Sequence, residues 1–306
     1  TLYDGATKVF EQVDKKMTKF ISEKLKVTPE EAKKIQKNYF QEYNTTLNGM
    51  IKNHKIDAKE FLDFVHDVDL SFLKNDKGFY PFLRNRVTFP ILNSSGKTIG
   101  FGGRVTDDSM PKYLNSKDSK FFNKTRELYG FNNAKKDHKT EDFIVTEGYM
   151  DVVMLSEYGI NNAVASLGTA FSQNHMNLMF KLRRKITFCF DSDEAGLKAA
   201  WRALQISLKN VVDDKTVRFL FLPEGYDPDS FVKENGEQEF YKKLDRAMVL
   251  ESFAFQYLKR GKKLDSPEDI RQIIFEFKKI LPLVTSEMLK ETLMTKFSSE
   301  LNINKE

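Results

Sequence analysis

The stretch ITFCFDSDEAGLKAA, residues 186–200, decides how this chain is interpreted. It begins with apolar and β-branched residues, a pattern typical of a buried strand. The run ends at two carboxylates, Asp191 and Asp193, and a glycine and a helix-forming segment follow them. The predicted junction between strand and helix therefore carries two acids, and the rest of the chain indicates what these acids hold.

The same pattern repeats over residues 141–240. Four predicted strands each lead into a helix, and they are DFIVTEG, NAVASLG, KITFCFDSD and TVRFLFLPEG. Strands that alternate with amphipathic helices indicate βαβ units, in which helices cover both faces of a parallel sheet. The expected fold class is therefore α/β.

The flanking regions have other patterns. Residues 1 to about 80 are rich in lysine and helical in periodicity, with Thr28 as an expected N-cap and Pro29 at the first helical position. The segment RVTFPILNSSGKTIGFGGRV, residues 86–105, predicts a hairpin around the NSSGK turn. Residues 242–306 predict three helices.

Composition excludes several classes of protein. The net charge is +5 and the pI is near 8.9, which permits an anionic partner without requiring one. The sequence contains no apolar run of about 20 residues and no signal peptide, so we expect a cytoplasmic location. The single cysteine, Cys189, rules out an internal disulfide and argues against zinc. The start without methionine suggests a fragment of a longer protein.

Three of the predicted strands end in pairs of acids. Because ligands of a parallel α/β sheet bind beyond the carboxyl ends of its strands, these side chains are expected at one edge. Six like charges close together repel strongly and need cations. Carboxylate oxygens suit Mg²⁺ or Mn²⁺, and two such ions support phosphoryl or nucleotidyl transfer. The six candidate metal ligands are Glu147, Asp151, Asp191, Asp193, Asp227 and Asp229.

A simpler interpretation exists for each pair. An aspartate before a helix is commonly an N-cap, because its oxygen accepts hydrogen bonds from the first backbone N–H groups. For any single pair this interpretation is favoured. Three such pairs on one edge favour a metal site.

A basic segment at residues 102–130 supplies a counterpart to the acids. Basic residues bind backbone phosphates and exposed aromatic rings stack on bases. For Phe121 and Phe122 a position in the core is favoured, and the four histidines are expected at ordinary surface or core positions. The basic residues of the segment are Arg104, Lys112, Lys117, Lys120, Lys124 and Arg126.

Several motifs resemble a known family. The Toprim domain, shared by primases and by type IA and type II topoisomerases, is similar to EGYMDV (147–152), ASLGTA (165–170), FDSDEAG (190–196) and LPEGYDPDSF (222–231). Bacterial DnaG-type primases are matched more closely, because RVTFPI, GKTIGFGGR, PKYLNS and LYGFNNA fall upstream in the order of that family. The resemblance is clear from about residue 80 to residue 250. One departure is Ser192, where the family usually has glycine between the central acids.

The resemblance implies three parts. A central Toprim domain with a parallel sheet flanked by helices is expected at 129–241. A mixed α+β subdomain, basic and template-binding, is expected at 1–128, and a small helical subdomain at 242–306.

The implied function is that of a DNA primase catalytic core, a DNA-directed RNA polymerase. It would synthesise short RNA primers from ribonucleoside triphosphates on single-stranded DNA at the replication fork, with two or more Mg²⁺ or Mn²⁺ ions and no zinc. The replicative helicase and single-strand binding protein are implied partners of the full-length protein, and no membrane is expected. Without the family's zinc-binding and helicase-docking domains, synthesis by this chain is expected to be weak and poorly selective.

The resemblance also implies roles for individual residues. Asp191 and Asp193 are the first candidates for metal ligands, completed by Asp227 and Asp229. Glu147 is either a ligand or a proton acceptor, and Asp151 an outer ligand, so the catalytic candidates are Glu147, Asp191 and Asp193. Nucleic acid or nucleotide binding is assigned to Arg104, Lys112, Tyr113, Asn115 and Lys124.

Two alternatives stay open from the sequence. One is another Toprim enzyme, either a topoisomerase fragment or an OLD-like nuclease, although no separate domain for a catalytic tyrosine is evident. The other is a single-stranded DNA-binding or helicase-docking module without activity. The acids at all three strand ends argue against the second alternative.

Overall fold

The computed structural model describes residues 9–43, 45–68, 82–138 and 140–303. The chain divides into two compact units, Thr1–Arg84 and Asn85–Glu306. The finer division at residues 128 and 241 stays a prediction.

The first unit consists of helices α1 (Val9–Leu25), α2 (Pro29–Tyr43), α3 (Thr46–His54) and α4 (Ala58–His66) in its described part. As expected, α2 begins at Pro29 after Thr28, whose Oγ1 accepts a hydrogen bond from the N–H of Glu31 at 3.3 Å. Helix α3 was not anticipated. A small apolar core joins the four helices and includes Phe20, Ile21, Met50, Phe61 and Val65.

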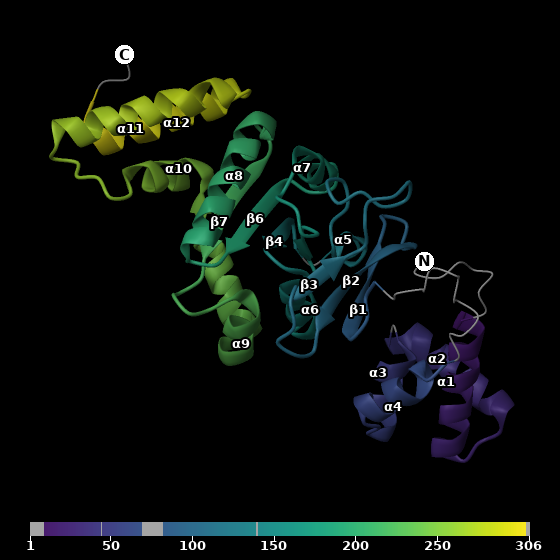
Figure 1. The fold of residues 1–306 in the computed structure, drawn as a ribbon. Coiled ribbons are helices and arrows are strands. Elements are labelled where there is room, and N and C mark those ends of the chain that lie inside the picture. The colour runs from purple at the N-terminus through teal and green to yellow at the C-terminus, as the bar shows by residue number, and fades with distance from the viewer. Residues whose placement is uncertain (1–8, 44, 69–81, 139, 304–306) are drawn as a thin grey trace. The chain divides into compact units, whose positions relative to one another are not determined.

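The second unit begins with a three-stranded antiparallel sheet of β1 (Arg86–Leu92), β2 (Thr98–Val105) and β3 (Tyr113–Asn115) (Figure 1). The predicted hairpin is confirmed. Asn93 shapes its turn by accepting hydrogen bonds from the N–H groups of Ser95 and Lys97. Strand β3 was not predicted, because three residues in a polar segment give too short a pattern.

A five-stranded sheet follows, and it confirms the α/β fold class. Its order is β5-β4-β6-β7-β8, with β4 (Asp142–Thr146), β5 (Ala163–Ala165), β6 (Lys185–Phe190) and β7 (Thr216–Phe221) parallel. The two-residue strand β8 (Met248–Val249) pairs antiparallel with β7 at the edge. Strand β8 was not predicted, because two residues are too few to show a periodic pattern.

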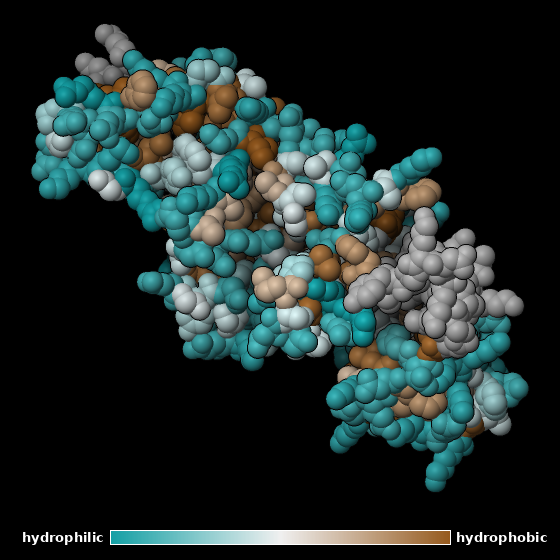
Figure 2. Space-filling model, viewed as in Figure 1, coloured by the Kyte–Doolittle hydropathy of each residue, from teal (hydrophilic) through white to brown (hydrophobic). Residues whose placement is uncertain are grey.

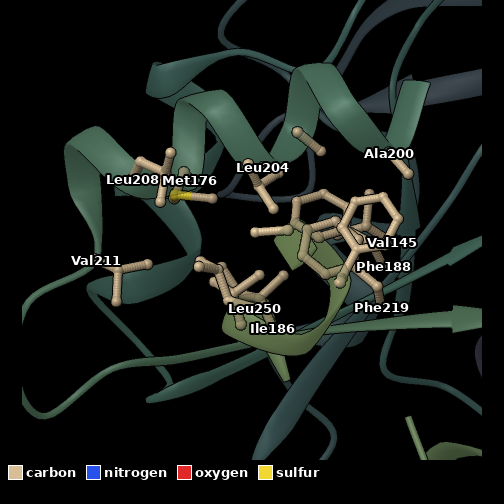
Figure 3. Close-up of a cluster of buried hydrophobic side chains, with 14 of the residues drawn as sticks. Val145, Met176, Ile186, Phe188, Ala200, Leu204, Leu208, Val211, Phe219 and Leu250 are labelled. Carbon is tan, nitrogen blue, oxygen red and sulfur yellow. The ribbon is translucent and has the colours of Figure 1, made fainter. Parts of the chain in front are cut away.

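Helices cover both faces of this sheet, as the strand pattern predicts. Helices α6 (Tyr149–Glu157) and α9 (Pro228–Asp245) share one apolar core with the face that contains Cys189. Helices α5 (Phe131–Ala134), α7 (Gln173–Phe180) and α8 (Glu194–Asn210) pack against the other face, which contains Phe188 and Phe219. Figure 3 shows this second core beneath α8. The continuous apolar run of β6 is thereby explained, because alternate residues enter different cores.

The C-terminal part contains α10 (Leu250–Lys259), α11 (Pro267–Ile280), a 3₁₀ turn (Leu281–Leu283) and α12 (Glu287–Leu301), the three helices expected (Figure 1). Their aromatic residues extend the core above α8, where Trp201 stacks on Tyr257 at 4.1 Å. Helices α11 and α12 join through Phe277 and Phe297, whose ring centroids lie 3.8 Å apart. Hydrophilic residues dominate the visible surface (Figure 2). In the described ranges no helix is long and apolar enough to cross a membrane.

Candidate active site

The sheet order brings the acidic strand ends to one edge. Strands β4, β6 and β7 are parallel neighbours, so their carboxyl ends meet at the same side. Five of the six predicted acids are close enough for their charges to interact, and these are Glu147, Asp151, Asp191, Asp193 and Asp227. The sixth, Asp229, lies half-buried in the first turn of α9 and is not among the charges that shift the pKa values of Glu147, Asp151 and Asp191.

Glu147 and Asp191 are linked directly across two strands. The backbone N–H of Asp191 donates a hydrogen bond to Glu147 Oε1 at 3.2 Å. Gly196 permits this approach, since a Cβ atom there would lie 2.2 Å from the Asp191 carbonyl oxygen and 2.9 Å from Glu147 Oε1. Only glycine fits this position without moving the backbone after β6.

Three of the acids also stabilise local structure. Asp193 is the N-cap of α8 and accepts a hydrogen bond from the N–H of Gly196 at 2.7 Å. Asp227 is the N-cap of α9 and accepts one from the N–H of Ser230 at 2.7 Å. Asp151 accepts one from the N–H of Gly148 at 3.0 Å. The N-cap interpretation is therefore confirmed for Asp193 and Asp227. Each cap uses one of the two carboxylate oxygens, so the other oxygen can still accept hydrogen bonds or bind a cation.

Burial and mutual repulsion raise the pKa values at this edge. Burial raises the pKa of Asp151 to about 7, and the charges of Asp227, Asp191 and Glu147 add to the effect. Burial raises the pKa of Asp191 to about 6, reinforced by Glu147, Asp227 and Asp193. The pKa of Glu147 is also raised, chiefly by burial, although the hydrogen bond from Asp191 opposes the shift. A cation beside these carboxylates would favour their ionised forms.

A cavity of about 300 Å³ opens between the ends of β6 and β7, and its walls include Asp191, Asp193, Tyr226 and Asp227. In the ranges that the structure describes, no three acids or histidines converge tightly enough to form a closed metal cage. Mg²⁺ does not require one, because it keeps several waters and is usually held by one or two carboxylates together with substrate phosphates. The donors present therefore fit a hydrated divalent ion that binds with a phosphate ligand.

Ser192 does not disturb the central acid pair. A residue other than glycine at a positive φ would be strained, and Ser192 does not adopt such a backbone angle. The departure from the family pattern therefore leaves the turn between β6 and α8 unstrained.

A groove between β1, β2 and the segment before β3 contains Arg104 and Lys112 together with Asp107 and Asp108. The guanidinium of Arg86 donates hydrogen bonds to the carbonyls of Pro111 and Lys112, at 2.7 and 3.3 Å, and so fixes the segment that leads into β3. Lys112 Nζ and the Arg104 guanidinium carbon each lie 5.9 Å from the centre of the Tyr113 ring. The groove has a volume of about 700 Å³ and is lined by Val87, Phe89, Arg104, Val105, Thr106, Asp107, Asp108, Ser109, Met110, Lys112 and Met150.

Helix α6 connects this groove to the acids. Tyr149 and Met150 stand between Glu147 and Asp151 in the chain, and the Tyr149 ring lies edge-on to Tyr113 at 5.3 Å. The Tyr149 hydroxyl and the Arg104 Nε are buried without a hydrogen-bond partner. Buried polar atoms are usually paired, so these two are exceptions, and the side-chain oxygen of Asn115 is another.

The remaining predicted binding residues lie in different surroundings. Asn115 is half-buried where the two sheets meet, with its side-chain oxygen 2.9 Å from the position of a Cβ on Gly102. Lys124 is half-buried in the loop before α5. Phe122 is buried as favoured, whereas that expectation was wrong for Phe121, which is 80% exposed. A phenylalanine pair gives no sequence signal for which ring enters the core.

Three further residues lie close to the site and were not predicted to have a role, and they are Gly196, Tyr149 and Arg202. Arg202 projects from α8 into a second cavity, about 160 Å³, whose wall also includes Glu147. The glycine and the tyrosine lie inside quoted motifs, but only the packing distances reveal what they do. No periodicity in α8 distinguishes Arg202 from an ordinary surface residue.

Comparison with known proteins identifies the family. Residues 6–135 match the family model described as the DNA primase catalytic core, N-terminal domain, and residues 144–232 match a Toprim-like family. A crystal structure of a DNA primase domain from Pseudomonas aeruginosa has 40% sequence identity and a TM-score of 0.71, over 84% of this chain and 80% of that one. This chain belongs to the DnaG-type DNA primase catalytic cores.

Other primases agree with this assignment. The DNA primase of Escherichia coli strain K12 is 41% identical over 231 residues, 75% of this chain and 40% of the relative. The chain thus spans about two fifths of that primase. A DnaG primase catalytic domain bound to single-stranded DNA has 32% identity and a TM-score of 0.69, over 95% of this chain and 98% of that one. The family membership disfavours the topoisomerase and nuclease alternatives.

Proposed function

We propose that this primase core catalyses template-directed synthesis of short RNA primers on single-stranded DNA. The substrates would be ribonucleoside triphosphates, and each step would join a 3′-hydroxyl to an α-phosphate with release of pyrophosphate. The observation that carries the proposal is the mutual proximity of Glu147, Asp151, Asp191 and Asp227. Besides burial, the charges of Glu147 and Asp227 raise the pKa values of Asp151 and Asp191. Such repulsion is difficult to explain unless a cation offsets it.

The acids would hold divalent ions, Mg²⁺ or Mn²⁺. When bound, these ions supply charge stabilisation at the transferring phosphate and orient its oxygens. Asp191 and Asp227 face the cavity between β6 and β7 and are the primary candidates, with the free oxygen of Asp193 beside them. Asp151 and Asp229 are assigned outer positions, because Asp151 is partly buried in the first turn of α6 and Asp229 follows Asp227 in the first turn of α9.

Glu147 has a raised pKa and a hydrogen bond from the Asp191 backbone, which holds its carboxylate over the strand ends. A carboxylate with a raised pKa is a better proton acceptor at neutral pH than an ordinary glutamate. Glu147 is therefore a candidate to accept the proton of the attacking hydroxyl. Alternatively, Glu147 would coordinate a divalent ion.

The groove that contains Arg104 and Lys112 would bind the template or the nucleotide. Arg104 and Lys112 supply charges for phosphates, Tyr113 presents a half-exposed ring for a base, and Lys124 extends the basic surface along the following loop. The related primase domain solved with single-stranded DNA supports this assignment. Asn115, whose buried side-chain oxygen has no hydrogen-bond partner, is proposed to bind nucleic acid or nucleotide beside the groove. The replicative helicase and single-strand binding protein are proposed partners of the whole protein, and the cytoplasm is its proposed location.

Primer synthesis on a single-stranded template with ribonucleotides and Mg²⁺ or Mn²⁺ tests the proposal. The wild-type chain is expected to extend primers only when a divalent ion is present, and Asp191→Asn is expected to bind DNA without synthesis. Binding without synthesis by the wild-type chain, at any Mg²⁺ or Mn²⁺ concentration, would instead support the non-catalytic module.

A further inference from the structure

His175 is a buried polar residue that the proposed reaction does not use. Its side chain has no exposed surface, and the three cavities described above do not include it in their walls. Nevertheless both ring nitrogens have hydrogen-bond partners. A buried histidine with two directed bonds determines the geometry of whatever it binds.

The first bond defines the state of the ring. The backbone N–H of Ser172 donates to His175 Nδ1 at 3.2 Å, so Nδ1 carries no proton. Burial lowers the pKa of His175 to about 4, which keeps the ring neutral at physiological pH. The single ring proton therefore resides on Nε2.

The second bond reaches the basic loop. His175 Nε2 lies 3.1 Å from the carbonyl oxygen of Lys124 and donates its proton there. Two neighbours on the same side of the loop reinforce this contact. Thr169 Oγ1 donates to the same carbonyl at 3.4 Å, and Ser172 Oγ donates to the carbonyl of Thr125 at 2.7 Å.

These bonds add an attachment to a loop that also has contacts of its own. The N–H of Lys124 donates to Asp118 Oδ1 at 3.0 Å, and Phe122 is buried in a small apolar core. Between β3 and α5 the chain forms no helix or strand, yet it carries Lys117, Lys120, Lys124 and Arg126. Its far end is tied to the sheet where Tyr129 and Ala165 exchange two backbone hydrogen bonds. The start of α7 supplies another attachment, in which His175 is joined by Thr169 and Ser172 in bonding the backbone of Lys124 and Thr125.

We propose that His175 is a positioning residue that fixes the backbone at Lys124 and thereby sets the Lys124 side chain for contact with nucleic-acid phosphate. This inference rests on the proposed nucleic-acid binding by the loop. His175 itself touches neither DNA nor nucleotide, and its effect on binding passes entirely through Lys124.

Two substitutions distinguish the hydrogen bond of His175 Nδ1 from that of His175 Nε2. In His175→Gln the side-chain NH₂ can replace Nε2 and keep the bond to Lys124, whereas in His175→Asn the side chain is too short and can replace only Nδ1. We expect His175→Asn to speed native-state trypsin cleavage between residues 117 and 126 by about tenfold, because the loop opens more often. His175→Gln should restore most of the protection.

Binding of a single-stranded oligonucleotide gives the functional measurement. His175→Asn should weaken binding by at least about threefold and lower the salt dependence to the value of Lys124→Ala, since one phosphate contact is lost. The double variant should bind no more weakly than Lys124→Ala alone, as expected for two residues that act through one contact. A purely structural role would instead give additive losses and an unchanged salt dependence.

Contrary results have distinct meanings. Equal cleavage rates for wild type and His175→Asn would overturn the anchoring itself. If Lys124→Ala binds the oligonucleotide as tightly as the wild type, Lys124 does not contact nucleic acid. The proposed binding role of the loop would then be wrong, whatever the cleavage rates, and the inference would fail with it. Thermal unfolding verifies that each variant is folded. If His175→Asn does not fold, Thr169→Val replaces it, because this variant removes the weaker hydrogen bond to the Lys124 carbonyl. The same changes in trypsin cleavage and in oligonucleotide binding are then expected, at a smaller size.

Discussion

The backbone N–H of Asp191 donates a hydrogen bond to the Glu147 carboxylate at 3.2 Å, and this contact ties the end of β6 to the end of β4. Residues 44 positions apart in the chain are thereby held at one edge of the sheet. The bond lowers the pKa of Glu147, but burial and the charge of Asp193 outweigh it, so the pKa of Glu147 is raised.

Asp191→Asn should reduce primer synthesis by about 100-fold or more, because the carboxylate is lost while the shape is kept. Oligonucleotide affinity should stay within about twofold, since the proposed phosphate contacts lie elsewhere. The matched control is Asp265→Asn, an exposed acid in the loop before α11, which should leave synthesis unchanged. Equal loss of binding and synthesis would contradict the assignment of Asp191 to catalysis.

The stability of the site should depend on pH in a defined direction. In the folded chain the pKa is about 6 for Asp191 and about 7 for Asp151, above the value of about 3.9 in an unfolded chain. Stability due to these groups is therefore fully present below about pH 4 and is lost as the pH rises towards 7.

Asp191→Asn removes this repulsion. In EDTA its melting temperature should exceed that of the wild type by more at pH 7.5 than at pH 5, and Mg²⁺ should narrow the difference by stabilising the wild type. A difference that is constant across this pH range, with no effect of Mg²⁺, would indicate that the acids act only as helix caps.

Gly196→Ala should damage the site through packing alone. The new methyl group would lie 2.2 Å from the Asp191 carbonyl oxygen, and relief of that clash should cost about 1–3 kcal/mol of folding stability and most of the activity. Gly148→Ala is the comparison for stability, since its methyl group would meet neighbours only at 3.5 Å or more. Urea denaturation of both variants measures the difference. Equal stability would show that the backbone after β6 can move freely.

Lys112→Ala should weaken binding of single-stranded DNA and reduce the slope of log K against log salt by about 0.7, the value for one phosphate contact. Fluorescence anisotropy at several salt concentrations gives the slope. Lys263→Ala, in the loop before α11, changes the net charge equally and should leave the slope unaltered. If both variants weaken binding alike, the effect comes from overall charge and the groove is not the binding site.

Much of the fold follows from patterns that the sequence displays. Parallel strands such as β6 are apolar throughout because both of their faces are buried, and this made the sheet and its strand ends predictable. Helix α2 was predictable from Thr28 and Pro29, since capping chemistry is local. Strands β3 and β8 were not, because their pairing is determined by distant partners.

The candidate site also contains residues that the sequence predicts and residues that it does not. The acids directly follow predicted strands, so the sequence shows where they stand. Their meeting at one edge was also predictable, because parallel strands place their carboxyl ends on the same side of the sheet. The contribution of Gly196 depends on a distance to Glu147 across two strands, and that of His175 on a loop about 50 residues away. Neither contact leaves a periodic or compositional signal. The opposite exposures of Phe121 and Phe122 likewise depend on tertiary packing and not on the residues themselves.

The central claim is that acids from three strand ends form one divalent-ion site. Anomalous diffraction from crystals soaked with Mn²⁺ and a ribonucleoside triphosphate tests it most directly. The account predicts a manganese peak beside Asp191, in the cavity shared with Asp227, and loss of that peak in Asp191→Asn. No peak at these carboxylates, under conditions in which the same protein synthesises primers, would contradict it.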